Sequence, residues 1–381
     1  MNAPWRHKMI LAPWATHPEK SKGRRFSEPE DPQRTYYQRD RDRIIHCTAF
    51  RRLEYKTQVF VNHEGDLFRN RLTHSLEVAQ IARSLARILK LNQDLAETIA
   101  LAHDLGHTPF GHAGQDALNA IVKEKTPEIG GFEHNLQSLR VVDELEERYA
   151  LFNGLNLSFE TRAGILKHCS KKNALLLGDV AQRFLKNEQP SLEAQLVNLS
   201  DEVAYNNHDI DDGLRSGLIH LEQLENITLW NTHYQNIRKT FPDLKGRRVI
   251  AETIRQIINT LIKDIAEHTE RNIHQYRIET AEDVPFAPLI VSFSPEIKEQ
   301  AQILKKFLMD NLYRHYQVMR MSLKAEHIVK SLYTTFLDNT KLLPTDYQKT
   351  DKTEQAIAIR DYIAGMTDRY AMKEYRNLFD I

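Results

Sequence analysis

Apolar residues recur at helical spacing along most of this chain, and that pattern restricts the fold more than any other feature. Between Leu72 and Lys90 the apolar side chains fall three or four residues apart, which places them on one face of an α-helix. The pattern predicts further helices over residues 92–105, 113–125, 135–149, 160–169, 191–207, 250–274, 295–332 and 354–379. Residues 283–294 contain two prolines and are expected to be irregular or extended. The predicted fold class is all-α.

Local signals set the ends of several helices and divide the chain. Asn92 and Ser191 are good N-cap residues, and Gly106 can end the helix over 92–105. The N-terminal segment is rich in proline and charge, which indicates an extended arm, partly disordered or packed on a partner subunit. We expect an arm over residues 1–35, a catalytic helical core over 36–216 and a C-terminal helical region over 217–381 packed on the core.

Charge balance and cysteine content exclude several classes of protein. The chain contains 52 Lys and Arg against 52 Asp and Glu, and this balance argues against a protein that coats polyanions. The two cysteines are too few for a disulfide framework, and no apolar run approaches the ~20 residues of a membrane span. The N-terminus lacks the apolar core of an export signal. These features predict a cytoplasmic protein without membrane association.

Residues far apart in the sequence form a ligand set for a divalent metal: His74, His103, Asp104 and Asp201. Two imidazoles and two carboxylates suit Mn²⁺, Mg²⁺, Fe²⁺ or Ni²⁺ better than a closed structural zinc site. A lone histidine or His-Asp pair is more often structural, but this order of ligands in a helical chain favours a metal centre. His107 and His112 follow the His-Asp pair. Histidines that transfer protons beside a metal indicate hydrolysis of a phosphate ester.

Helical geometry limits how these side chains can meet. Adjacent helical residues point about 100° apart, so His103 and Asp104 reach one ion only near the end of their helix. Asp201, Tyr205 and Asp209 are spaced four residues apart, which places all three on one helical face. A metal ligand and two polar side chains are therefore expected to lie in a row.

Longer motifs resemble the HD-domain metal-dependent phosphohydrolases, and among them the bacterial dGTPase-like triphosphohydrolases of the type 2 group. The motifs are RDRDRIIH (residues 39–46), AFRRL (49–53), KTQVF (56–60), NRLTHSLEV (70–78), HDLGHTPFGH (103–112), GFEHN (131–135), DEVAY (201–205) and DYIAGMTD (361–368). They span most of the chain. The resemblance implies an HD-domain core with an added C-terminal helical region. It also implies cleavage of a dNTP, with dGTP as one candidate, to a deoxynucleoside and inorganic triphosphate.

The resemblance implies roles for individual residues. The family's metal ligands, for one divalent ion per subunit, match His74, His103, Asp104 and Asp201. His112 matches the catalytic histidine, and Gln115 stands where many relatives carry the acidic partner of that histidine. Glutamine can orient a histidine through a hydrogen bond but cannot share its charge. His107 and His134 match histidines near the phosphates.

A second group of matching residues is expected to bind the substrate. Arg71 matches an arginine on the α-phosphate, and Tyr205 matches a tyrosine on the triphosphate. Gln58 and Asp209 match residues that read the sugar 3′-hydroxyl. Together these residues imply a site that holds a nucleoside triphosphate at both its phosphates and its sugar.

The resemblance also has implications for substrate selection and regulation. Crowding near Val59 and Tyr205 is expected to reject a ribose 2′-hydroxyl. Arg52 belongs to a basic stretch that can form a solvated face, a subunit contact or a site for a nucleotide or single-stranded DNA. Relatives often assemble as tetramers or hexamers, and some respond to nucleotides or DNA away from the metal. A homo-oligomer with such an effector is therefore expected.

Two other functions fit the same residues. Another HD-type nucleotidase or a cyclic-nucleotide phosphodiesterase would use similar chemistry at the metal but would release other products. A non-catalytic protein could bind dNTPs or single-stranded nucleic acid on this scaffold, with Gln115 marking lost catalysis. The near-zero net charge weighs against nucleic acid as the main ligand, and the complete set of metal ligands weighs against a dead site.

Overall fold

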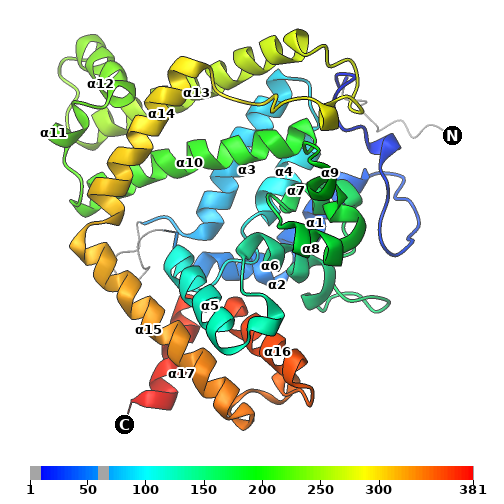
Figure 1. Cartoon of the computed structure of the whole chain (residues 1–381). Coiled ribbons are helices and arrows are strands. Elements are labelled where there is room, and N and C mark those ends of the chain that lie inside the picture. Colours follow the sequence, from blue (N-terminus) through cyan, green and yellow to red (C-terminus); the bar gives the residue numbers. More distant parts are fainter. Residues whose placement is uncertain (1–9, 59–67, 381) are drawn as a thin grey trace. The chain divides into compact units, whose positions relative to one another are not determined.

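The computed structural model describes residues 10–58 and 68–380, which form helices and the loops between them (Figure 1). Within these two ranges there is no strand, and extended pairing is limited to two isolated bridges, Arg24 with Ser158 and Thr57 with Asn70. The predicted all-α fold class is confirmed.

The α-helices of the described residues run in order from Tyr36 to Phe379. They are α1 (Tyr36–Ile45), α2 (Thr48–Arg52), α3 (Arg71–Ile88), α4 (Gln93–Ala102), α5 (Gly111–Lys125), α6 (His134–Arg140), α7 (Phe159–Ile165), α8 (Lys171–Leu177), α9 (Gln182–Lys186), α10 (Leu192–Ser216), α11 (Leu221–Leu224), α12 (Thr228–Thr240), α13 (Arg247–Gln275), α14 (Pro295–Leu308), α15 (Tyr316–Asp338), α16 (Lys352–Gly365) and α17 (Asp368–Phe379). Short 3₁₀ and π turns lie between several of them.

The chain divides into two compact units that alternate along the sequence. Unit 1 is made of Met1–Arg41, Leu76–Ala100 and Ser158–His315, and unit 2 of Asp42–Ser75, Leu101–Leu157 and Tyr316–Ile381. These boundaries do not coincide with the sequential division at residues 35 and 216, which stays a prediction.

Unit 2 is built around α5 and the C-terminal helices. α15 packs along α5, and α16 and α17 pack against α15 (Figure 1). The apolar side chains between these helices form one buried cluster, with members Phe110, Leu118, Ile121, Val122, Val329, Leu332, Phe336, Ile359 and Ile363. The C-terminal region therefore supplies much of the core against which α5 is packed.

Unit 1 is organised by α10, which contacts α7, α13 and α14. The predicted cap is confirmed, because Ser191 Oγ accepts a hydrogen bond from Ala194 N at 3.3 Å. α10 continues to Ser216, beyond the predicted end at residue 207, and stops at Gly217, whose φ of 75° suits glycine. α12, which packs on α13, was not predicted from the periodicity.

Helix starts agree better with the sequence than helix ends. Asn92 caps α4 as predicted, since its Oδ1 accepts a hydrogen bond from Leu95 N at 3.0 Å. The helix expected over 135–149 is shorter, because α6 passes into a π turn over Val141–Leu145.

Two long predicted helices are each broken in the structure. The helix expected over 295–332 is interrupted by a π turn over Met309–Tyr313, after which α15 runs to Asp338. The helix expected over 354–379 breaks at Met366 and Thr367, where the Thr367 hydroxyl accepts a hydrogen bond from Tyr370 N at 3.2 Å and caps α17. The predicted irregular segment 283–294 contains only a 3₁₀ turn over Val284–Phe286.

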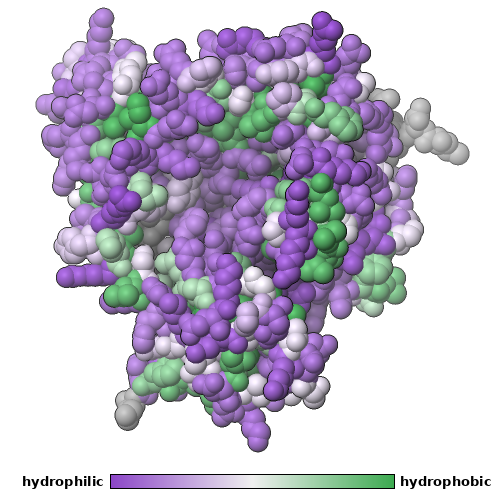
Figure 2. All heavy atoms as spheres, in the orientation of Figure 1, coloured by the Kyte–Doolittle hydropathy of each residue, from purple (hydrophilic) through white to green (hydrophobic). Residues whose placement is uncertain are grey.

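On the face drawn in Figure 2 the hydrophobic residues occur in separate groups. Figure 2 shows a mainly hydrophilic face on which the hydrophobic patches are not continuous. Among the described helices, none combines the length and the hydropathy that a membrane crossing needs.

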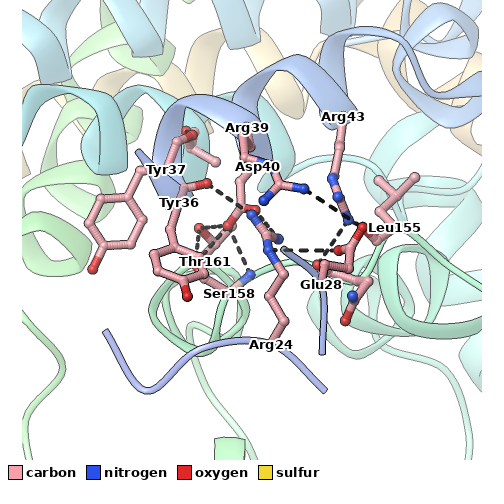
Figure 3. Close-up of polar contacts among 12 residues, drawn as sticks. Arg24, Glu28, Tyr36, Tyr37, Arg39, Asp40, Arg43, Leu155, Ser158 and Thr161 are labelled. Carbon is pink, nitrogen blue, oxygen red and sulfur yellow. Dashed lines mark hydrogen bonds and ion pairs between the residues drawn. The ribbon is translucent and has the colours of Figure 1, made fainter. Parts of the chain in front are cut away.

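The N-terminal arm packs on its own unit, and its anchor is Asp40 of α1 (Figure 3). The Asp40 carboxylate pairs with Arg24 Nη1 at 2.5 Å and accepts hydrogen bonds from the Ser158 amide and hydroxyl and from the Thr161 hydroxyl. Farther along the arm, Thr16 donates two hydrogen bonds to the buried Glu193 carboxylate. The described part of the arm is therefore ordered on the chain itself, which the sequence did not predict.

Replacing Asp40 by asparagine should lower the stability of the protein measurably. The substitution removes the negative charge beside Arg24 and turns an amide N–H₂ toward groups that are themselves donors. We expect the free energy of unfolding to fall by about 2–4 kcal/mol in urea titrations. The control is Asp310→Asn, which removes an exposed ion pair with Lys306 and should leave the free energy of unfolding nearly unchanged. Equal effects of the two variants would contradict the anchoring role of Asp40.

Candidate active site

Unit 2 gathers most of the histidines that the sequence singled out. Their positions are fixed by the ends of helices: α3 begins with Arg71 and His74, α4 ends just before His103 and Asp104, α5 begins with Gly111 and His112, and α6 begins at His134. Because these residues lie at or near the ends of four helices, their side chains can face one place within unit 2.

Three of the four predicted metal ligands lie in unit 2. The rings of His74 and His103 have their centroids 5.5 Å apart, and both side chains are buried. Asp104 Oδ1 lies 3.2 Å from His103 Nε2. The pair follows the last residue of α4, as the geometry of a shared ion requires. The fourth predicted ligand, Asp201, belongs to unit 1.

The Asp104 carboxylate contacts an arginine and two histidines in this unit. Its Oδ2 accepts a hydrogen bond from Arg71 Nη1 at 2.7 Å, and its Oδ1 lies 3.3 Å from His107 Nε2. Burial alone would raise the pKa of Asp104, but His103, His107 and Arg71 outweigh it and hold that pKa well below its ordinary value. Asp104 is therefore ionised at neutral pH, as a metal ligand must be.

Arg71 is buried beside Asp104 with unused donors. Its side chain is 1% exposed, and within the described part of the chain its Nε and Nη2 have no hydrogen-bond partner. Space around Nη2 is limited, because a Cβ placed on Gly111 would lie 3.2 Å from it. Gln58 Oε1 is also buried without a partner among the described residues. Buried polar groups of this kind indicate a polar ligand, and a planar guanidinium suits phosphate.

His107, His112 and His134 form a ring cluster next to this arginine. The rings of His107 and His134 are stacked at 4.1 Å, and the His112 ring meets His107 edge-on at 5.6 Å. Burial and the charges of Arg71 and His134 keep the pKa of His107 well below its ordinary value, so His107 is neutral at pH 7. His112 is exposed, which leaves it accessible to a substrate.

Gln115 orients a different histidine from the one expected. Its Oε1 lies 2.7 Å from His134 Nδ1 and accepts a second hydrogen bond from His134 N at 3.2 Å. Gln115 therefore fixes the ring of His134, and its expected place beside His112 stays a prediction. Spacing along one helix could not reveal a partner at the start of another.

In unit 1 the predicted row along one helical face is present on α10. Asp201 pairs with Lys167 at 2.6 Å, and the ring of Tyr205 stacks on that of Tyr313 at 6.2 Å. The Tyr313 hydroxyl donates a hydrogen bond to Asp209, whose carboxylate is buried. Lys167 and Tyr313 were not predicted, because each lies outside the motifs that carry the resemblance.

Two remaining sequence candidates are outside these groups. Arg52 is exposed, and its Nη1 donates a hydrogen bond to Gly365 O at 3.2 Å. Val59 lies outside the described residues.

Lys56 is a buried lysine that the sequence analysis did not single out. Its Nζ donates hydrogen bonds to His107 O at 2.5 Å and to Ala364 O at 2.9 Å. Burial, aided by the charge of Arg52, lowers the pKa of Lys56 from 10.5 to about 7. Above pH 7 the unfolded chain therefore holds a proton that the native protein has released, so this residue makes stability rise with pH.

A comparison of wild type with Lys56→Met tests this shift. As the pH increases from 7 to 10, wild type should gain stability relative to the variant, by at most about 5 kcal/mol for a shift of this size. Urea unfolding at several pH values measures the difference, and Lys172→Met, at an exposed lysine, should follow wild type. Parallel curves for wild type and Lys56→Met would contradict the lowered pKa.

Two known family models match separate ranges of the chain. The family model of the HD domain matches residues 71–206, and that of the phosphohydrolase-associated domain matches residues 291–377. With a helical core and a buried His-Asp doublet, the chain is an HD-domain phosphohydrolase by fold and family.

Sequence identity to curated proteins places the chain in one family within this class. The chain is 63% identical over 371 residues to a deoxyguanosinetriphosphate triphosphohydrolase-like protein of Bordetella pertussis, with 97% of each chain covered. It is 62% identical over 379 residues to a protein of the same description from Ralstonia nicotianae, covering 100% of this chain and 97% of the relative. The chain therefore belongs to the deoxyguanosinetriphosphate triphosphohydrolase-like family, and the resemblance found in the motifs is confirmed.

Proposed function

We propose that this protein is a metal-dependent hydrolase that converts a dNTP to a deoxynucleoside and inorganic triphosphate. The observation that carries the proposal is Arg71, a buried guanidinium beside Asp104 and the histidine cluster, with two nitrogen donors that have no partner among the described residues. A site with these groups can accept a phosphate and transfer protons to its ester oxygen. The relatives are named deoxyguanosinetriphosphate triphosphohydrolase-like, which supports a nucleoside triphosphate as the substrate.

The proposed metal site consists of His74, His103, Asp104 and Asp201. His74 and His103 offer ring nitrogens and the ionised Asp104 adds a carboxylate, while Asp201 is proposed as the fourth ligand on the resemblance. This set of nitrogen and oxygen donors fits Mn²⁺, Mg²⁺, Fe²⁺ or Ni²⁺, one per subunit. When bound, the ion supplies an activated water and neutralises charge on the α-phosphate.

The protein's own groups would bind the phosphates and supply the proton. Arg71 would direct Nε and Nη2 at the α-phosphate, since its Nη1 is held by Asp104. His107 and His134, the latter oriented by Gln115, would lie beside the other phosphates. The 5′-oxygen leaves as an alkoxide unless it is protonated, and the exposed His112 would give it that proton.

The sugar would be read at the end of the substrate away from the triphosphate. Asp209 would accept a hydrogen bond from the 3′-hydroxyl, with Gln58 as a second partner and Tyr205 against the triphosphate. Tyr313 would hold the Asp209 carboxylate in place. Arg52 and Val59 stay proposed substrate residues on the resemblance alone.

Asp209→Asn should reduce the preference for a 3′-hydroxyl. A hydrogen bond to a charged group contributes about 1.5–3 kcal/mol, so wild type should prefer a dNTP to the matching 2′,3′-dideoxy substrate by roughly 10- to 100-fold in kcat/KM. In the variant this ratio should fall but stay above one, because the amide oxygen and Gln58 can still contact the hydroxyl. A ratio unchanged from wild type would remove Asp209 from the sugar site.

We also propose that the protein assembles as a homo-oligomer, either a tetramer or a hexamer. A nucleotide or single-stranded DNA is proposed as its effector, and the cytoplasm as its location. Size measurements by light scattering with and without each dNTP test the assembly. A change of mass or activity with a second nucleotide is the expected result.

The activity itself is tested by a panel of substrates. Purified protein with Mn²⁺ or Mg²⁺ is given each dNTP and rNTP, singly and in mixtures, and the products are separated by ion exchange. Inorganic triphosphate from a dNTP is expected, and the mixtures detect an activating nucleotide. Release of phosphate or pyrophosphate instead would indicate another HD-type nucleotidase.

A further inference from the structure

Three segments far apart in the chain are joined in unit 2 by buried hydrogen bonds. Asp368, the first residue of α17, accepts hydrogen bonds from Thr57 N at 2.9 Å, from the Thr57 hydroxyl, and from Phe110 N at 2.9 Å. Lys56 bonds the carbonyl of His107 and the carbonyl of Ala364 near the end of α16. The loop before α5 is thus tied to the C-terminal helices at two points.

The loop needs such support because its backbone is in an unfavourable conformation. Phe110 has a φ of 63°, in the left-handed region that residues with bulky side chains rarely adopt, and Gly111 follows with a φ of 59°. Phe110 is the N-cap of α5 but has no capping side chain, so its own conformation begins the helix. Its ring lies in the core cluster shared with α15, α16 and α17.

This conformation decides where two proposed catalytic histidines point. His107 precedes Phe110 by three residues and His112 follows it by two. A return of Phe110 to an ordinary negative φ would rotate the start of α5 relative to the segment that carries His107, and the 5.6 Å contact between their rings would be lost.

We propose that Asp368 is a positioning residue: through Phe110 N and Thr57 it holds the left-handed turn that sets His107 and His112 toward the substrate. The proposal rests on the function proposed above. It assigns to the phosphohydrolase-associated region, which contains Asp368, the task of fixing the histidine loop of the HD domain. Its carboxylate is 1% exposed and all its contacts are donors, so an ionised or neutral oxygen acceptor is required at this place.

The test uses the full-length protein and two readouts. In Asp368→Asn one acceptor oxygen becomes an N–H₂ group facing a donor, so hydrogen exchange of the peptide covering residues 105–112 should become at least tenfold faster. Under saturating metal, kcat for triphosphate release should fall roughly 10- to 100-fold while KM changes less than threefold, because misplacement of reacting groups affects turnover. Thr57→Val should show a smaller effect in the same direction. Thr57→Ser, which keeps the hydroxyl, should have the exchange rate and kcat of wild type.

The matched control is Asp40→Asn, which removes another fully buried carboxylate that accepts from a backbone amide and hydroxyl groups, but in unit 1. It should lower global stability without faster exchange in residues 105–112. If Asp368→Asn alters this peptide no more than Asp40→Asn does, or if Thr57→Ser behaves like Thr57→Val, the positioning role is wrong. If wild type releases no triphosphate, the proposed function fails, and the exchange data alone decide whether Asp368 holds the loop.

Discussion

The Asp104→Asn variant should lose bound divalent metal and triphosphohydrolase activity together. Asparagine is neutral, so it attracts a cation less, and it leaves the buried guanidinium of Arg71 without its counter-charge. Even residues that only support metal ligands typically contribute 10- to 100-fold to affinity, so a direct ligand should contribute more than about 100-fold. Metal content by mass spectrometry and Mn²⁺ titration measure the first effect, and triphosphate release measures the second.

A nearby carboxylate provides the control for this variant. Asp116 is exposed on α5, one residue after Gln115, and Asp116→Asn should keep both metal and activity. If Asp104→Asn binds Mn²⁺ as wild type does, Asp104 is not a ligand, and its role is confined to pairing with Arg71.

The second large effect is expected for His112→Ala, which should lower kcat by about 10²–10⁴-fold with metal content unchanged. The reason is that the departing 5′-alkoxide is strongly basic and needs a proton as the bond to phosphorus breaks. A substrate with a leaving group that needs no proton separates this role from binding. With p-nitrophenyl triphosphate, the variant should retain most of the wild-type rate.

His46→Ala is the matched control, because His46 is also an exposed histidine of unit 2 and has no assigned role. It should behave as wild type with both substrates. An equal loss of rate by His112→Ala on the nucleotide and on the aryl substrate would show that His112 does not act as the acid.

The sequence predicted the fold class and the helix starts because both depend on local chemistry. Asn92 and Ser191 cap their helices through their own side chains, and an amphipathic pattern needs no distant partner to be recognised. The breaks at Met309–Tyr313 and at Met366 were missed because apolar periodicity continues through them. Where a helix stops there is decided by packing between elements.

The candidate site was predictable in its residue types but not in all its pairings. His74, His103 and Asp104 lie together in unit 2 as the motifs suggested. The contact of Gln115 with His134 was not predicted, because helical spacing describes neighbours on one helix and His134 begins another. Tyr313 and Asp368 act across long stretches of sequence, through contacts that only the folded chain brings about.

The most direct test of the proposed reaction is hydrolysis of a dNTP in H₂¹⁸O with the products analysed by mass spectrometry. Attack of water on the α-phosphorus predicts one ¹⁸O atom in the inorganic triphosphate and none in the deoxynucleoside, with the signal absent from Asp104→Asn. Label in the deoxynucleoside, or in a mono- or diphosphate product with no triphosphate formed, would contradict the proposed function.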